Sequence, residues 1–381
     1  MNDITIFSSS NIQETIEYYK NLRLNSPIFW SEKYNAWVLS RYSDIKNILI
    51  DDSHFPIGAG NNINALSNSS SEEELIQNKL DGYDKYHLIV EFYKLYFKGM
   101  PTESFIQKNL LLLNKVFSSI PIEQEINLTQ KLNYPSSLSF IYSFINFSDI
   151  EINLYNELIN NVDYFNFTEI YHKISPTTNE YISNFNIYKN LIDYLNINNI
   201  NEYDYYKNIL IEFVNSHIKE TQSAITGLQN GILFAINNNK NTFLNMNSSN
   251  LLNFVDESIR YITFNSHISR KCLHDYVIYN QKIKRGDNII LLLGSANFDE
   301  TIFGEDSNTF NINRNINIRT LEFGMGNHFC IAYRAIRHHL HIYLKNLFKI
   351  KDSINITNII YDNNFVCLGS PIKEIYGILT K

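Results

Sequence analysis

Cysteine is scarce in this chain, and its three residues, Cys272, Cys330 and Cys367, are far apart. This spacing gives no even, closely spaced disulfide framework, and reduced thiols fit a reducing compartment. The first ten residues lack the basic segment and apolar run of a signal peptide. No segment reaches the roughly 18 uninterrupted apolar residues of a membrane span. We therefore expect a cytoplasmic protein with no membrane partner.

The chain also lacks a basic stripe, a linker and internal repeats. Its formal net charge of −7 and pI near 5.8 argue against nucleic acid as a partner. No segment rich in Pro, Gly or Ser divides the 381 residues, so we expect a single domain over 1–381. The absence of a repeat of about 20 to 50 residues excludes solenoids and propellers.

Hydrophobic periodicity predicts a mainly α protein with a minor β component. Helical spacing runs through residues 103–117, 205–237 and 249–261. Short alternating runs at 36–39 and 277–283 indicate strands. The turn residues 284–287 then predict a hairpin between 277–283 and 288–293.

A glycine-rich loop delivers Cys330 to the start of a helical run over residues 331–347. Residues 323–332 read Phe-Gly-Met-Gly-Asn-His-Phe-Cys-Ile-Ala, and Gly324 and Gly326 permit backbone angles that other residues avoid. The start of the helix points free amides and the positive dipole end toward the sulfur, which favours the thiolate. Such a thiolate can bind haem iron and promote cleavage of the O–O bond, with Phe323 shielding the sulfur from water. The alternative is a cysteine that only packs a loop.

This loop resembles that of the cytochrome P-450 family, Phe-Gly-x-Gly-x-His-x-Cys-x-Gly/Ala, from Phe323 to Ala332. Upstream, Glu257-Ser-Ile-Arg260 matches the family's Glu-x-x-Arg signature. Further family positions occur in the expected order at Arg270, Gly286, Ala296-Asn297-x-Asp299, Phe310 and Arg314. The resemblance covers at least residues 205–347. It implies a triangular-prism fold with haem b buried between a long central helix and the cysteine loop, and Cys330 as the iron ligand.

The resemblance also implies a proton relay on the central helix, at Glu220 and Thr221. The family pattern is Ala/Gly-Gly-x-Asp/Glu-Thr, and only its final pair is retained, 36 positions before Glu257. Thr221 would hydrogen-bond the distal oxygen and an ordered water that Glu220 links to solvent. Ile218 stands where a small residue normally opens a groove for oxygen. The alternative is a solvated Glu-Thr pair on a helix face.

The haem propionates need cationic or hydrogen-bonding partners, and Arg270 and His328 fit by position. The family often adds His-x-x-x-Arg on an N-terminal helix, but residues 84–91 contain no arginine. His87 is the nearest histidine there, or else a plain surface residue. Glu257 and Arg260 share a helix face three positions apart. In the resembled fold they are buried and support the cysteine loop, so losing either should cost haem incorporation.

The resemblance implies a haem-thiolate monooxygenase, an oxidoreductase of secondary metabolism. Two electrons would come from a separate ferredoxin or flavodoxin with its reductase, because no flavin or iron–sulfur region is fused here. The expected reaction hydroxylates a small, largely apolar or aromatic molecule. One alternative is a peroxide-using or non-oxidative haem-thiolate enzyme. Another is a catalytically weak haem protein that binds a ligand tethered to a carrier protein.

Overall fold

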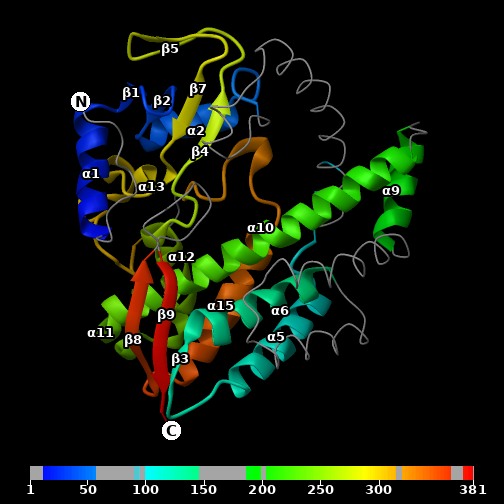
Figure 1. Cartoon of the computed structure of the whole chain (residues 1–381), viewed down its shortest axis with the longest axis vertical. Helices are drawn as coiled ribbons and strands as arrows, with labels where there is room; N and C mark the ends of the chain where they lie inside the picture. Colours follow the sequence, from blue (N-terminus) through cyan, green and yellow to red (C-terminus); the bar gives the residue numbers. More distant parts are fainter. Residues whose placement is uncertain are drawn as a thin grey trace.

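The computed structural model describes residues 12–56, 91, 94, 99–145, 186–198, 203–314, 320–361 and 372–380, and helices form most of this part (Figure 1). The helices are α1 (Ile12–Asn25), α2 (Tyr42–Ile50), α5 (Glu103–Ser118), α6 (Tyr134–Ile145), α9 (Asn186–Ile197), α10 (Tyr203–Asn238), α11 (Lys240–Asn245), α12 (Leu251–Ile262), α13 (Leu293–Ala296), α14 (Glu300–Phe303) and α15 (Tyr333–Lys349). A π-helix, η1 (Thr129–Asn133), leads into α6, and the 3₁₀ turns η2 (Ser248–Asn250) and η3 (Gly326–His328) lie before α12 and before Cys330.

Helix α10 is the longest described element and crosses the molecule diagonally (Figure 1). Its C-terminal half packs against α6, α12 and β9. Ile225, Ile232, Leu233 and Ala235 are fully buried there. A helix that buries apolar side chains on several faces belongs inside the protein core. The central helix expected for residues 205–237 is therefore confirmed.

The sheets are small, and the two larger ones each pair strands from distant parts of the chain. A four-stranded sheet has the order β1-β2-β7-β4, in which only the β2–β7 pair is parallel. A three-stranded sheet has the order β3-β9-β8. The bounds are β1 (Ile28–Ser31), β2 (Ala36–Leu39), β3 (Glu125–Asn127), β4 (Ile268–Lys271), β7 (Asn288–Leu291), β8 (Ile354–Tyr361) and β9 (Ile372–Leu379).

The remaining two strands correct the predicted hairpin. Residues 277–283 do not form one strand: β5 (Tyr276–Ile278) and β6 (Gln281–Ile283) pair with each other. Tyr279 and Asn280 make the tight turn with positive φ angles of 48° and 62°, as a two-residue hairpin turn requires. Strand β7 instead pairs with β2 and β4, and β2 lies about 250 residues away in the chain. The helices expected over 103–117, 249–261 and 331–347 correspond to α5, α12 and α15.

Candidate functional site

The loop before Cys330 is shaped by two glycines with positive φ angles. At Gly324 φ is +73°, and an added Cβ would lie 3.2 Å from the carbonyl oxygen of His328. At Gly326 φ is +71°, and an added Cβ would lie 3.2 Å from both Leu49 O and Ile50 Cα, at the end of α2. These contacts exclude larger residues. The loop is therefore folded tightly on itself and against α2, as the sequence predicted for its glycines.

Cys330 lies three residues before the start of α15, where backbone amides reach its sulfur. Its own N–H donates to Phe323 O at 2.9 Å, which closes the loop. The N–H groups of Ala332 and Tyr333 donate to the thiol and lower its pKa, but burial outweighs them and raises the pKa to about 11. The amides at the helix start therefore favour the thiolate, as expected, while burial of the sulfur has the larger effect on its pKa. A metal that binds the sulfur has to displace its proton.

Aromatic rings surround the cysteine turn. The Phe323 ring lies edge-on to Tyr333, with ring centroids 5.0 Å apart, and Phe329 packs against the same tyrosine at 5.2 Å. Phe323 also packs against the main core cluster, as do Cys330 and Ile331. These apolar surroundings limit access of water to the cysteine turn.

A buried amide–acid pair supports the loop from the preceding segment. Asn297 Nδ2 donates to Glu322 Oε2 at 2.8 Å, and Asn297 Oδ1 accepts from Leu321 N at 3.0 Å. The Glu322 carbonyl oxygen accepts from Asn265 Nδ2 at 3.1 Å. Burial raises the pKa of Glu322 well above its usual range. Asn297 and Asn265, from two other segments of the chain, thus fix the backbone immediately before Phe323.

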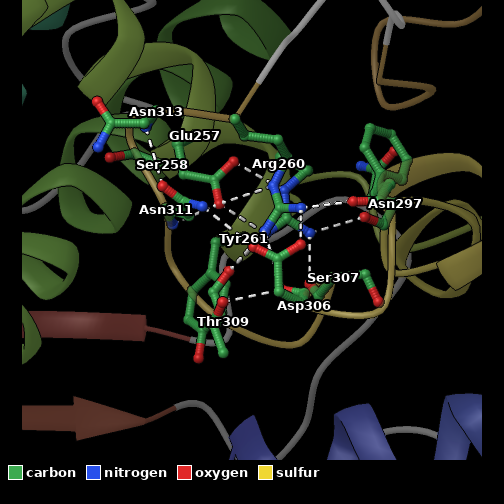
Figure 2. A network of polar contacts seen from close by, with 12 residues as sticks. Glu257, Ser258, Arg260, Tyr261, Asn297, Asp306, Ser307, Thr309, Asn311 and Asn313 are labelled. Carbon is green, nitrogen blue, oxygen red and sulfur yellow. Dashed lines mark hydrogen bonds and ion pairs between the residues drawn. The ribbon is translucent and has the colours of Figure 1, made fainter.

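The ion pair of α12 is buried and makes many contacts (Figure 2). Glu257 and Arg260 are both 0% exposed, and their two parallel hydrogen bonds measure 2.7 and 2.8 Å. The guanidinium also donates to the carbonyl oxygens of Asn297, Ser307 and Thr309 at 2.8 to 2.9 Å. A buried charge is tolerated when it is paired and hydrogen-bonded in this way. The structural role expected for the pair is confirmed.

The segment that carries Arg314 closes over Glu257. The carboxylate accepts from Asn311 N at 2.8 Å and lies 3.4 Å from Arg314 Nε. Arg314 in turn pairs with Asp306 at 2.8 Å. Figure 2 shows how Asp306, Thr309 and Asn311 gather around the pair. Helix α12 is thereby tied to the chain that leads toward the cysteine loop.

The two residues expected to hold the propionates come from different elements. Arg270 lies on β4, is 5% exposed, and among the described residues its one side-chain hydrogen bond is to Ser269 O at 2.8 Å. Burial lowers its pKa to about 10, and the charge of Asp52 opposes this shift. His328 Nε2 lies 3.5 Å from Asp52 Oδ1. A buried guanidinium with so few acceptors suits an anionic group.

The relay residues are less fully described. One face of α10 makes hydrogen bonds to α6 through Gln222, Thr226 and Gln229. Thr226 Oγ1 lies 3.0 Å from Ser137 Oγ, and Gln229 Nε2 lies 2.7 Å from Ser136 Oγ. Thr221 precedes Gln222 by one position, so it points about 100° away from that face, and it is half-buried. Glu220 lies in α10, but its side chain is outside the described part, and so is His87.

Sequence reasoning missed Asp52, Glu322 and His339. Glu322 had a weak signal, because it precedes the motif directly. Asp52 had none, since it lies 276 positions before His328. His339 Nδ1 lies 3.1 Å from Asn109 Oδ1, and His339 Nε2 lies 3.1 Å from Gln229 Nε2, so this ring links α5, α15 and α10.

The donor set fits haem better than a bare metal ion. No cluster of three His, Cys, Asp or Glu suitable for a metal occurs in the described ranges. A porphyrin brings four nitrogen ligands of its own and asks the protein for one axial ligand and for partners to its two propionates. Cys330 can supply the first, and Arg270 and His328 can supply the second.

Comparisons with known proteins agree with this geometry. Residues 228–349 match the family described as Cytochrome P450. Cytochrome P450 123 of Mycobacterium tuberculosis is 36% identical over 84 residues, which is 22% of this chain and 21% of that protein. The mycinamicin VIII C21 methyl hydroxylase of Micromonospora griseorubida is 35% identical over 129 residues, 34% of this chain and 32% of that enzyme. The chain thus spans about a fifth to a third of the length of these curated relatives.

The fold matches over nearly the whole chain. The Tepidiphilus thermophilus P450 heme domain superposes with a TM-score of 0.76 at 15% identity, over 99% of this chain and 96% of that one. CYP109E1 from Bacillus megaterium, in complex with corticosterone, gives 0.72 at 17% identity, over 98% and 100%. The protein has the cytochrome P450 fold, mainly helical with a minor sheet component. Residues 228–349, about a third of the chain, match the cytochrome P450 family, whose cofactor is haem. Across the described ranges, no helix has the length and apolar character needed to cross a membrane.

Proposed function

We propose that this protein is a haem-thiolate monooxygenase that oxidises a small, largely apolar molecule. The observation that carries the proposal is the position of Cys330. Its sulfur accepts from the Ala332 and Tyr333 amides at the start of α15, in a loop that Gly324 and Gly326 hold tightly. Single-cysteine ligation with these surroundings suits haem iron and oxygen chemistry. The activity of the curated relatives, a steroid C26-monooxygenase and a methyl hydroxylase, is of the same kind.

Each side chain has a role that follows from its chemistry. Haem bound at Cys330 would supply the activation of O2 and the transfer of one oxygen atom to the substrate. The Ala332 and Tyr333 amides would temper the charge on the sulfur, and Arg270 and His328 would hold the propionates. Thr221 would hold a proton at its hydroxyl, and Glu220 would pass protons to it from solvent.

The ligand assignment is tested by one spectrum. Dithionite-reduced protein exposed to carbon monoxide should show the red-shifted Soret maximum of thiolate-ligated haem, and Cys330→Ser should abolish that band. Cys272→Ser is the control, because Cys272 is buried and, among the described residues, its sulfur bonds the His274 carbonyl oxygen. A normal band in Cys330→Ser would refute the proposal.

The relay is tested by coupling. Thr221→Ala should consume electrons and release peroxide with less hydroxylated product, because the variant lacks the hydroxyl that would hold a proton beside the haem site. Thr226→Ala is the control, since the Thr226 hydroxyl donates to Ser137 on the face of α10 that contacts α6, and Thr221 does not lie on that face. Equal coupling in wild type and Thr221→Ala would remove Thr221 from the mechanism.

The electron donor we propose is an acidic ferredoxin or flavodoxin in the cytoplasm. Arg334, Lys345 and Lys349 are exposed on the outer face of α15, the helix that follows Cys330. Cations on a protein of net charge −7 would steer an acidic partner to this face. Lys345→Glu should raise the KM for ferredoxin and leave turnover with hydrogen peroxide unchanged. Turnover with peroxide alone, and none with ferredoxin, would favour the peroxide-using alternative.

For the substrate we propose a rigid apolar compound such as a steroid. Two structural neighbours are complexes with corticosterone and testosterone, and one curated relative is a steroid C26-monooxygenase. Titration with corticosterone should shift the Soret band as the compound displaces water at the haem. A band that moves only with a carrier-tethered ligand would favour the binding-protein alternative.

A further inference from the structure

A carboxylate lies among the residues expected to hold the haem propionates. Asp52 Oδ1 is 3.5 Å from His328 Nε2, and Asn327 Nδ2 donates to Asp52 Oδ2 at 2.9 Å. The charge of Asp52 also acts on Arg270, where it opposes the effect of burial. One acidic side chain therefore lies beside His328 and acts electrostatically on Arg270, and it is only 21% exposed.

The fold holds Asp52 in this place. It follows the last turn of α2, where Leu49 O and Ile50 Cα would lie 3.2 Å from a Cβ added to Gly326. On its other side the chain is fixed by the buried Phe55 and by a hydrogen bond of 2.8 Å from Leu273 N to His54 O. Neighbouring Asp51 turns away from the loop and bonds Ser53 and His54 instead. The carboxylate beside His328 is thus positioned by packing on both sides.

We infer that Asp52 is a positioning residue of the haem edge, which orients Asn327 and His328 and keeps a fixed negative charge beside the propionates. The inference rests on the proposed function. Reduction of the bound iron by one electron, from the redox partner or from dithionite, adds one negative charge to the haem. A fixed carboxylate nearby repels that charge, and the repulsion is weakly screened where the charge is partly buried. Asp52 therefore lowers the reduction potential of the bound haem.

The test is the reduction potential of the haem-loaded protein, measured by equilibrium with mediator dyes. Asp52→Asn keeps an acceptor for Asn327 and removes the charge, so the potential should become more positive. Asp51→Asn makes the same change one residue away, on a carboxylate that does not bond the loop, and should give a clearly smaller shift. Asp52→Glu, which keeps the charge, should stay close to wild type.

A second variant leaves Asp52 in place. Asn327 is exposed, so Asn327→Lys sets a cation beside the carboxylate, and the potential should again become more positive. The coupling to His328 is measured in a double-mutant cycle, where Asp52→Asn should have a smaller effect in a His328→Gln background.

The outcomes separate this inference from the proposed function. Wild type must first show the red-shifted carbon monoxide band, and its absence would end the proposed function itself. With that band present, a potential in Asp52→Asn equal to that of Asp51→Asn, or loss of haem from Asp52→Asn, would overturn the inference. An unchanged potential in Asn327→Lys would also overturn it.

Discussion

Glu322, the residue before Phe323, is a buried acid whose protonation is linked to stability. Burial raises its pKa well above the usual 4.5 in the folded protein. Above pH about 4.5 the unfolded chain releases this proton while the folded chain keeps it, so the acid costs more stability as pH rises toward the folded pKa. We expect Glu322→Gln to gain stability relative to wild type between pH 5 and pH 8, in urea midpoints. The exposed Glu305→Gln is the control, and a constant difference across this range would contradict the prediction.

At the level of single residues, the sequence predicts the site where its members are close together in the chain. Phe323, Gly324, His328 and Cys330 lie within eight positions, and the structure places them in one tight loop. Asp52 could not be predicted, because its proximity to His328 depends on how α2 packs against η3. The opposing effect of burial on the pKa of Cys330 could not be predicted either, since burial is a property of the folded core.

Among the elements, α12 carries the ion pair on which the cysteine loop depends. Arg260→Ala would leave Glu257 as a buried charge that keeps only part of its hydrogen bonds, and such losses cost about 3 to 5 kcal/mol. We expect a lower urea midpoint and incomplete haem incorporation, measured as the ratio of Soret to protein absorbance. Arg337→Ala is the matched control: it breaks the Arg337–Asp256 pair between α12 and α15, whose arginine is 32% exposed. This pair is partly open to solvent, where an ion pair is screened and contributes less than a fully buried one, so equal losses in the two variants would contradict the prediction.

Helices were predicted better than strand pairs for a physical reason. The spacing of buried residues in α5, at Phe105, Leu112, Leu113 and Val116, repeats the helical period and is visible in the sequence. Strand β7 could not be assigned its partners in this way, because β2 lies in a distant part of the chain and its register depends on the completed core. The local alternation of residues 277–283 fitted one long strand as well as the short hairpin that is observed.

At the scale of the whole molecule, a buried histidine joins helices that enclose the site. His339 on α15 is 0% exposed, and it contacts Asn109 on α5 and Gln229 on α10. Asn109 Oδ1 can only accept, so Nδ1 carries the proton and Nε2 accepts from the Gln229 amide. Gln229 also donates to Ser136 on α6. One neutral imidazole thus connects α5, α6, α10 and α15.

This arrangement predicts acid sensitivity of the fold. Burial lowers the pKa of His339 from 6.5 to about 3, so as pH falls below 6.5 the unfolded chain binds a proton that the folded chain does not. Stability is then lost by up to about 1.4 kcal/mol for each pH unit.

The test is His339→Asn, which should be less stable than wild type at pH 7.5. Between pH 7 and pH 5, however, its urea midpoint should fall less than that of wild type. Some acid sensitivity should persist, because burial also lowers the pKa of His267, to about 4. His274 is exposed, so His274→Asn should show the same fall of the urea midpoint with falling pH as wild type. An equally steep fall in His339→Asn would show that the His339 ring does not hold the helices together.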